Sequence, residues 1–342
     1  MPDVTIYTLA KELNMTPSMV SRAFNPDGKI SESKRKIVLE TAKKYGFSPN
    51  RFASRLSMKT VHIGILISSG FNVNTERMIK GIETAYENLK DYKVKYDITV
   101  LNPEQSNFKD YEKVLSGYKN SDGVILTGMS ASKYADMIND FYKQNENIVQ
   151  VQAINSDADY LFASKHNEET ASSLSAEFLY NCLRKSNSKN ILLFTGNKES
   201  ALHQSAEIAF CDTCKKMGMN VLECIDMKDN EDYFKKLLPE VFEKYDDKTD
   251  GIYITSGFST PLSEFLEQKG LNIPYVAFDA YKDTKTYMEK GIVTAIISQN
   301  VSKQMETAFQ LLVEHIITGT ECNKTIYTDV QLVLKSNMHQ FD

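Results

Sequence analysis

The chain begins with apolar residues spaced at a helical period. One face of a first helix is formed by Ile6, Leu9, Ala10 and Leu13. Asn14 and Met15 interrupt this period, and a second helix is expected from Pro17, with an inward face of Met19, Val20, Ala23 and Phe24. A third helix is expected from Ser31 to Gly46. The pattern predicts a helix-turn-helix, although an ordinary helical hairpin would give the same spacing.

From Val61 the pattern changes to short apolar runs separated by amphipathic stretches. Strands are predicted at 61–68, 95–102, 122–128 and 147–153, and again near 160–164, 190–195, 220–225, 251–255 and 274–278. Helices are predicted between them at 75–90, 107–119, 132–145, 168–184, 200–217, 231–245 and 260–269. A helix at 300–317 and a strand near 326–334 come last and are candidates to cross back between lobes.

This alternation is typical of parallel, doubly wound sheets, and two consecutive sets predict two similar lobes. The expected fold class is α/β, with a small all-α head at 1–48, a connecting segment at 49–60 and a two-lobed body at 61–342. The first lobe is assigned about 61–160 plus 300–323, and the second about 161–299 plus 324–342. A ligand is expected in the cleft between the lobes, where strands end.

The charge distribution separates the head from the body. Residues 1–60 carry 11 basic and 5 acidic side chains, which gives +6, so the net charge of −5 leaves −11 for residues 61–342. A basic head on an acidic body indicates a nucleic-acid-binding module attached to a body that does not bind nucleic acid. Residues 49–60 are basic and lack an apolar stripe, so they favour a solvated linker that a partner could order as two helical turns.

The composition is that of a folded soluble protein, with 42% hydrophobic and 25% charged residues in 342. We expect a cytoplasmic protein without membrane partners, because the start is unlike a signal peptide and no apolar run approaches the ~18 residues of a membrane span. The five cysteines indicate reduced thiols, and Cys211 and Cys214 favour packing over a metal or redox site. We expect no metal, no cofactor and no catalytic residues, since neither ligand spacing nor a nucleotide-binding or nucleophile motif occurs.

Two motifs resemble the LacI/GalR family of bacterial transcriptional regulators. VTIYTLAKELNMTPSMVSRAFN, residues 4–25, is similar to the family's helix-turn-helix signature, and GFSPNRFASRLSMKT, residues 46–60, is similar to its hinge helix. The resemblance covers essentially the whole chain. It implies a DNA-binding head, a hinge helix at 49–60, and an effector-binding and dimerisation body like the periplasmic sugar-binding proteins.

The resemblance also implies contacts with double-stranded operator DNA. Bases would be read from positions 17, 18 and 22, where only Arg22 can make the bidentate pair with guanine, beside Pro17 and Ser18. In the hinge, Leu56 would wedge into the minor groove, with Ala53 beside it and Asn50 on the backbone. The remaining DNA contacts implied are Thr5, Tyr7, Thr16, Ser21, Asn25 and Ser31.

For the effector cleft the match is looser. PYVAFDAYKD places Asp279 where an effector hydroxyl is bound in the family, and TAIISQN places Gln299 at another cleft position. Asp279 could equally cap the next helix, and the loop serines could simply satisfy backbone groups. The other cleft candidates are Ser68, Ser69, Phe71, Asn72 and Ser256.

Three departures from the family pattern bear on the effector. Ala206 stands where the family has an arginine that grips a sugar, Ser256 and Gly257 replace an Asn-Asp pair, and Met305 replaces a glycine. An alanine removes five donors held in a fixed fork, so the common sugar-binding geometry does not carry over.

Together these features predict a homodimeric repressor that binds a palindromic operator and answers to a small-molecule effector, a carbohydrate or related metabolite. The alternative is a solute-binding or sensor protein of the periplasmic-binding fold without a DNA-binding role. The +6 head and the absence of a signal peptide argue against that alternative.

Overall fold

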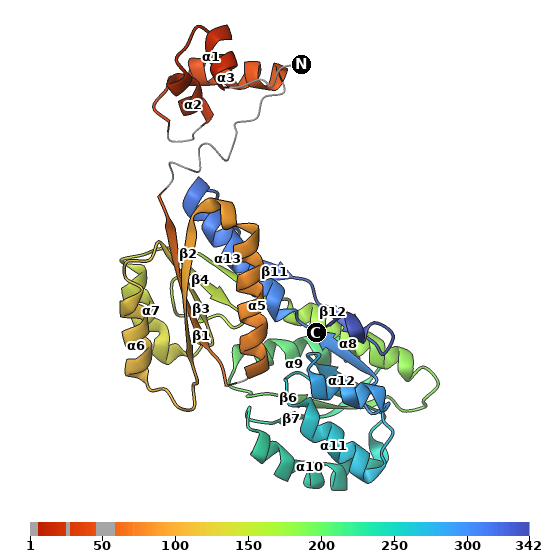
Figure 1. The fold of residues 1–342 in the computed structure, drawn as a ribbon. Helices are drawn as coiled ribbons and strands as arrows, with labels where there is room; N and C mark the ends of the chain where they lie inside the picture. Colours follow the sequence, from red (N-terminus) through yellow and green to blue (C-terminus); the bar gives the residue numbers. More distant parts are fainter. Residues whose placement is uncertain (1–5, 25–27, 46–58, 71, 342) are drawn as a thin grey trace.

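The computed structural model describes residues 6–24, 28–45, 59–70 and 72–341 (Figure 1). Three helices occur where the apolar period predicts them: α1 (Ile6–Glu12), α2 (Pro17–Phe24) and α3 (Glu32–Lys44). Their common core buries Leu9, Ala10, Val20, Ala23, Val38 and Ala42. The Arg35 guanidinium on α3 fixes the end of α2, because it donates hydrogen bonds to the carbonyl oxygens of Ala23 (3.3 Å) and Gly28 (2.9 Å).

The first lobe is a six-stranded sheet in the order β11-β5-β4-β3-β1-β2, and all its pairs are parallel. Its strands are β1 (Val61–Ser68), β2 (Val94–Leu101), β3 (Gly123–Thr127), β4 (Ile148–Val151), β5 (Phe162–His166) and β11 (Thr325–Thr328). One face is covered by α5 (Asn72–Asn88) and α13 (Val301–Thr318), and the other by α6 (Phe108–Gly117) and α7 (Ala135–Tyr142). Short 3₁₀ turns lie at Lys90–Tyr92 and Ser132–Tyr134.

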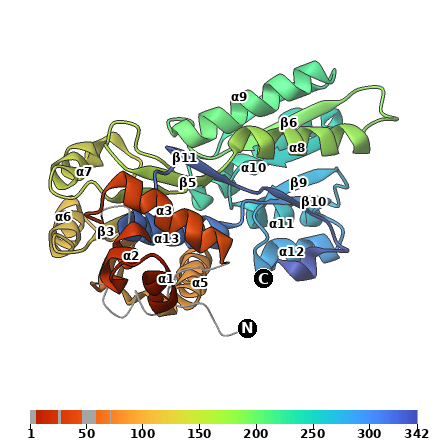
Figure 2. The ribbon, with the colours of Figure 1, turned by 90° about the horizontal axis from the view of Figure 1, so that it is seen from above.

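The second lobe repeats this plan, in the order β12-β10-β9-β8-β6-β7. Its strands are β6 (Asn190–Thr195), β7 (Asn220–Asp226), β8 (Gly251–Ile254), β9 (Tyr275–Phe278), β10 (Ala295–Ser298) and β12 (Gln331–Val333), which is antiparallel to β10. Two helices lie side by side on one face, α8 (Glu168–Cys182) and α9 (Ala201–Lys216) (Figure 2). The other face carries α10 (Glu231–Tyr245), α11 (Ser259–Lys269) and α12 (Lys282–Glu289), with 3₁₀ turns at Asp246–Lys248 and Met338–Gln340.

The doubly wound, two-lobed body is therefore as the sequence predicted. Its central strands bury both faces, and burial of such apolar runs between two helix layers is what selects parallel sheets. The helices α5 and α13 approach each other closely at Gly81, where a Cβ would lie 2.2 Å from the Ser302 carbonyl oxygen. No helix in the described part of the chain has both the length and the apolar character that a bilayer crossing requires.

The chain passes between the lobes three times: from β5 to α8, from β10 to α13, and from β11 to β12. The expected lobe boundaries need correction here, because β5 and β11 extend the first sheet rather than the second. They pair with each other in parallel, Thr325 opposite Ala163, at the edge of that sheet. The single strand expected near 326–334 is thus two strands in two sheets.

Two elements were not predicted, β10 and α12. β10 has four residues, all buried, and in this it is like the predicted strands β4, β8 and β9, so its length does not explain why it was missed. α12 has a largely polar sequence, KDTKTYME, and buries only Thr284 and Met288, so it has no apolar stripe. The expected hinge helix at 49–60 lies almost wholly outside the described residues.

Candidate functional site

The second helix of the head presents a polar face. Val20 and Ala23 are buried, whereas Ser18, Ser21 and Arg22 on α2 are exposed. Tyr7 on α1 is 71% exposed, so this large aromatic side chain lies on the surface of the head and not in its core. The Thr16 hydroxyl accepts a hydrogen bond from the Met19 amide (3.2 Å) and so caps α2. A surface of small hydroxyls and one guanidinium suits contacts with phosphates and base edges.

The structure describes only some of the other residues that are expected to contact DNA. Pro17 is half-buried at the start of α2, and exposed Ser31 precedes α3, with its hydroxyl 3.3 Å from that of Ser33. The expected contacts at Thr5, Asn25, Asn50, Ala53 and Leu56 lie outside the described residues, as does the cleft candidate Phe71.

Asp279, the central cleft candidate, is already occupied by its own chain. It follows β9 with a positive φ of 63° and is only 2% exposed. Its Oδ2 accepts hydrogen bonds from Gln299 Nε2 (2.7 Å) and from the Tyr281 hydroxyl (3.2 Å), and Oδ1 accepts a longer bond from the Gln299 amide (3.4 Å). A buried carboxylate needs such donors, because burial without them would cost several kcal/mol. The fold thus brings Asp279 and Gln299 together.

Tyr281 joins the two lobes. Its hydroxyl lies 3.0 Å from Asn74 Oδ1 on α5, so its single hydrogen is shared between Asn74 and Asp279. On the same helix, Arg77 donates to the Ala280 carbonyl oxygen (2.6 Å) and places its guanidinium 5.1 Å from the centre of the Tyr281 ring. Burial and the neighbouring Asp279 carboxylate raise the pKa of Tyr281 well above its usual value, so it stays a hydrogen-bond donor. We call Asn74, Arg77, Asp279 and Tyr281 the interlobe latch.

The glycine at 257 makes room for this tyrosine. A Cβ at Gly257 would lie 3.0 Å from Tyr281 Cε2, closer than a relaxed contact allows. The position is one of the two where the sequence departs from an Asn-Asp pair. Its neighbour Ser256 is buried, and its hydroxyl has no hydrogen-bond partner among the described residues. The ring of Tyr281 therefore fills space that a longer side chain at 257 would need.

Gln299 connects the latch to a series of buried hydrogen bonds near the segments where the chain passes between the lobes. Its carbonyl oxygen accepts a hydrogen bond from Gln304 Nε2 on α13 (2.8 Å), and the Gln304 carbonyl accepts one from the Ser164 hydroxyl on β5 (2.9 Å). All three residues are buried. Breaking buried hydrogen bonds of this kind costs free energy. A displacement of Asp279 is therefore passed by direct contacts to two of the interlobe connections, the one from β10 to α13 and the one from β5 to α8.

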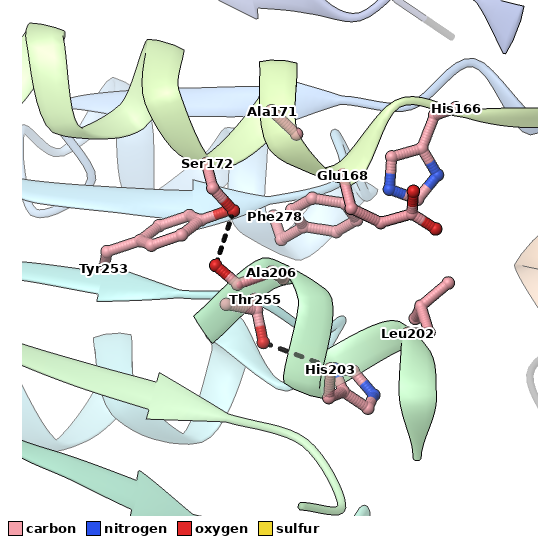
Figure 3. Close-up of a pocket in the computed structure, with 10 residues that line it drawn as sticks. All are labelled: His166, Glu168, Ala171, Ser172, Leu202, His203, Ala206, Tyr253, Thr255 and Phe278. Carbon is pink, nitrogen blue, oxygen red and sulfur yellow. Dashed lines mark hydrogen bonds between the residues drawn. The ribbon is translucent and has the colours of Figure 1, made fainter. Parts of the chain in front are cut away.

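A small cavity lies mostly in the second lobe, and His166 at the end of β5 in the first lobe is part of its wall (Figure 3). It has room for about one water molecule, with a volume of about 10 Å³. Its walls come from α8, α9 and the ends of β8 and β9, and Ala206 is part of them, at the position where the family has an arginine. The lining residues are His166, Glu168, Ala171, Ser172, Leu202, His203, Ala206, Tyr253, Thr255 and Phe278.

The polar groups of the cavity are only partly matched within the chain, and the buried Tyr253 hydroxyl has no hydrogen-bond partner among the described residues. Glu168 Oε1 lies 2.6 Å from Lys165 Nζ, and His203 Nδ1 lies 3.3 Å from the Thr255 hydroxyl. Burial lowers the pKa of His166, which is therefore neutral near pH 7, and its Nδ1 has no hydrogen-bond partner among the described residues. No arginine lines this cavity, so its chemistry suits hydroxyl groups better than a phosphate. Across the described ranges, no cluster of three or more His, Cys, Asp or Glu side chains is placed to hold a metal ion.

The remaining cleft candidates do not converge on Asp279. Ser68 is buried, and its hydroxyl lies 2.7 Å from that of Tyr111 on α6. The Ser69 amide donates to the Leu101 carbonyl oxygen (3.0 Å), and Asn72 is exposed at the start of α5. The sequence missed the other latch residues, Asn74, Arg77 and Tyr281. Tyr281 stands inside the quoted segment PYVAFDAYKD, but only the fold shows that its hydroxyl returns to Asp279.

Comparison with known proteins identifies the family to which this fold belongs. Residues 57–321 match the family model described as the periplasmic binding protein domain. The chain is 25% identical over 285 residues to catabolite control protein A of Priestia megaterium, which spans 80% of each chain. It is 27% identical over 250 residues to the HTH-type transcriptional regulator pepR1 of Lactobacillus delbrueckii subsp. lactis, across 71% of this chain and 70% of that one.

A solved structure gives the same fold. GanP, a glucose-galactose binding protein of Geobacillus stearothermophilus, superposes with a TM-score of 0.71, covering 82% of this chain and 99% of that one. The sequence identity is 17%, so this likeness concerns the fold alone.

Proposed function

Because this chain belongs to the periplasmic binding protein domain family and to the LacI/GalR family of bacterial transcriptional regulators, we propose that it is a sequence-specific DNA-binding repressor. It binds a palindromic operator as a homodimer. A small-molecule effector, a carbohydrate or related metabolite, controls it from the cleft between the lobes. The observation that carries the proposal is the polar face of α2, Ser18, Ser21 and Arg22, on a head whose net charge is opposite to that of the body.

In this proposal α2 enters the major groove by its N-terminal end. Arg22 pairs with a guanine, and Pro17 and Ser18 contribute shape at the tip of the helix. The phosphate contacts are made by Thr5, Tyr7, Ser21, Asn25 and Ser31, and Thr16 is a further DNA contact. The hinge segment supplies Asn50, Ala53 and Leu56 to the minor groove, where an apolar wedge unstacks a base step at a cost of a few kcal/mol.

The effector site is built around Asp279 and Gln299, with Ser256 beside them. The expected first-lobe contacts are Ser68, Ser69, Phe71 and Asn72. A carboxylate and an amide that accept and donate hydrogen bonds suit a polyhydroxyl ligand, and the glucose-galactose binding of a neighbour in fold supports this class. Because the Asp279 carboxylate is already bonded to Gln299 and Tyr281, the effector reaches it only when the interlobe latch opens.

This arrangement gives the effector a way to act on DNA. A ligand hydroxyl that takes the place of the Tyr281 hydroxyl on Asp279 also releases Asn74 and so breaks one of the two interlobe hydrogen bonds of the latch, leaving only the bond from Arg77 to the Ala280 carbonyl oxygen. The resulting change in lobe angle alters the spacing of the two hinge segments in the dimer. By linkage, a ligand that weakens operator binding must itself bind more weakly to the operator complex.

The first experiment identifies the operator by sequencing the genomic DNA that the protein retains in cells. Binding of this operator and of random DNA is then compared for Arg22→Ala and for Lys43→Ala, which removes an exposed charge from α3. Arg22→Ala is expected to lower the preference for operator by about 1–3 kcal/mol, roughly 5- to 150-fold, and to leave salt-sensitive nonspecific binding. Lys43→Ala should lower both affinities by a similar small factor.

Equal losses on operator and on random DNA for Arg22→Ala would remove the base-reading role. Retention of no DNA at all would favour the second candidate, a sensor of the periplasmic-binding fold without a DNA-binding role.

A further inference from the structure

The fold brings together two cysteines that lie on different secondary-structure elements and share no sequence motif. Cys211 lies on α9 and Cys224 on β7, and their sulfur atoms are 3.7 Å apart. Both side chains are half-buried, so small molecules in solution can reach them. Cys214, the other half of the CxxC sequence, is instead fully buried in the core between α8, α9 and the sheet.

The surroundings distinguish the three thiols. A hydrogen bond from Cys224 lowers the pKa of Cys211 despite partial burial, and the nearby Lys198 ammonium acts in the same direction. The hydrogen bond to Cys211, together with burial, raises the pKa of Cys224, so Cys211 is the thiol of the pair that loses its proton first. Burial raises the pKa of Cys214 to about 12, which leaves it protonated and unreactive.

Lys198 also holds the two elements at this point. Its ammonium donates a hydrogen bond to the Cys224 carbonyl oxygen (2.8 Å) and lies 3.7 Å from Glu207 Oε1 on α9. The strand and the helix are therefore pinned to each other next to the sulfur pair. A disulfide requires sulfur atoms about 2.05 Å apart, so these must approach by about 1.7 Å.

We propose that Cys211 and Cys224 form a redox-modification site, which hydrogen peroxide or a related hydroperoxide converts into an intramolecular disulfide. The Cys211 thiolate attacks one peroxide oxygen, the O–O bond breaks, and a sulfenic acid and hydroxide form. The Cys224 sulfur then attacks the Cys211 sulfur, the S–S bond forms, and the sulfenic oxygen leaves as water. In total two thiols and one peroxide give one disulfide and two waters.

The disulfide would fix the C-terminal half of α9 onto β7. The N-terminal half of the same helix carries Leu202, His203 and Ala206, which line the small cavity. Oxidation therefore stiffens one wall of the proposed effector region without touching Asp279. The site itself does not depend on DNA binding.

The test treats the reduced full-length protein with hydrogen peroxide, blocks the remaining thiols with iodoacetamide and maps tryptic peptides by mass spectrometry. Trypsin separates residues 199–215 from 217–228, so a disulfide between Cys211 and Cys224 joins these two peptides. Cys214→Ser serves as the matched control, because it leaves one cysteine in the first peptide.

The wild type and Cys214→Ser are expected to give the joined peptides with loss of two hydrogens, and dithiothreitol should reverse it. Cys211→Ser and Cys224→Ser should not give them, and circular dichroism checks that each variant is folded. The melting temperature should rise on oxidation in the wild type and in Cys214→Ser only. The proposal is overturned if the wild type yields no joined peptides, if the link runs between subunits, or if Cys214→Ser loses it. None of these readouts requires operator DNA, so failure here is separate from failure of the repressor proposal.

Discussion

Replacing Tyr281 by phenylalanine tests the interlobe latch with the smallest possible change. The substitution keeps the ring that packs against Gly257 and Arg77 and deletes only the hydroxyl. The bond to the buried Asp279 carboxylate is part-buried and charge-assisted, which is worth about 1.5–3 kcal/mol. The bond to Asn74 adds less, about 0.5 kcal/mol, because Asn74 is half-buried and water can partly replace the hydroxyl there. We expect a loss of about 2 kcal/mol in the free energy of unfolding of the body.

The measurement is urea unfolding followed by circular dichroism. Tyr287→Phe is the matched control, since it deletes a hydroxyl from a half-buried tyrosine on α12 that is not part of the latch, and it should change stability by less than about 0.5 kcal/mol. A double-mutant cycle with Asn74→Ala isolates the bond between the lobes, and residues in direct contact should couple by at least about 0.5 kcal/mol. If Tyr281→Phe is as stable as the wild type, or if the cycle closes without coupling, the hydroxyl does not join the lobes.

Two further substitutions test other parts of the proposal. Leu56→Ala should reduce the operator bend measured by circular-permutation gel shift, because the apolar wedge is lost, and an unchanged bend would exclude Leu56 from this role. The pKa of His166 lies below 6.5 in the folded chain because of burial, so below that pH the unfolded chain binds more protons and stability falls as pH drops. His166→Gln should flatten this dependence in urea unfolding between about pH 7 and pH 5, and a slope as steep as that of the wild type would contradict it.

The apolar pattern was sufficient to predict most of the fold. It located all the long helices of the body and the parallel character of its sheets, because burial on one helix face or on both faces of a strand leaves a period in the sequence. It failed where burial leaves no period. α12 is too polar, and the edge strand β11 is only partly buried, so its sheet could not be assigned from its own residues. The miss of β10 has no such explanation, because its four buried residues resemble those of the predicted β8 and β9.

The candidate site was predictable in part, and for a different reason. Asp279 and Gln299 came from a motif resemblance, and the fold brings them within hydrogen-bond distance. Ala206 was found as a departure from the same motif, and it lines the cavity beside them. Asn74, Arg77 and Cys224 carry no local signal, because each depends on a partner more than ten residues away in the chain. Such pairs become visible only when the chain is folded.

The three crossings between the lobes also limit how the lobes can move relative to each other. Two compact bodies joined at three neighbouring points can rotate about the line of those points, whereas sliding or twisting would stretch at least one connection. The relative position of the lobes is then described by nearly a single angle. In the proposed mechanism, a bound ligand therefore affects the rest of the protein only through the value of the angle between the lobes. Two unlike ligands that set the same angle would be one signal, so all discrimination between metabolites has to be made at the moment of binding.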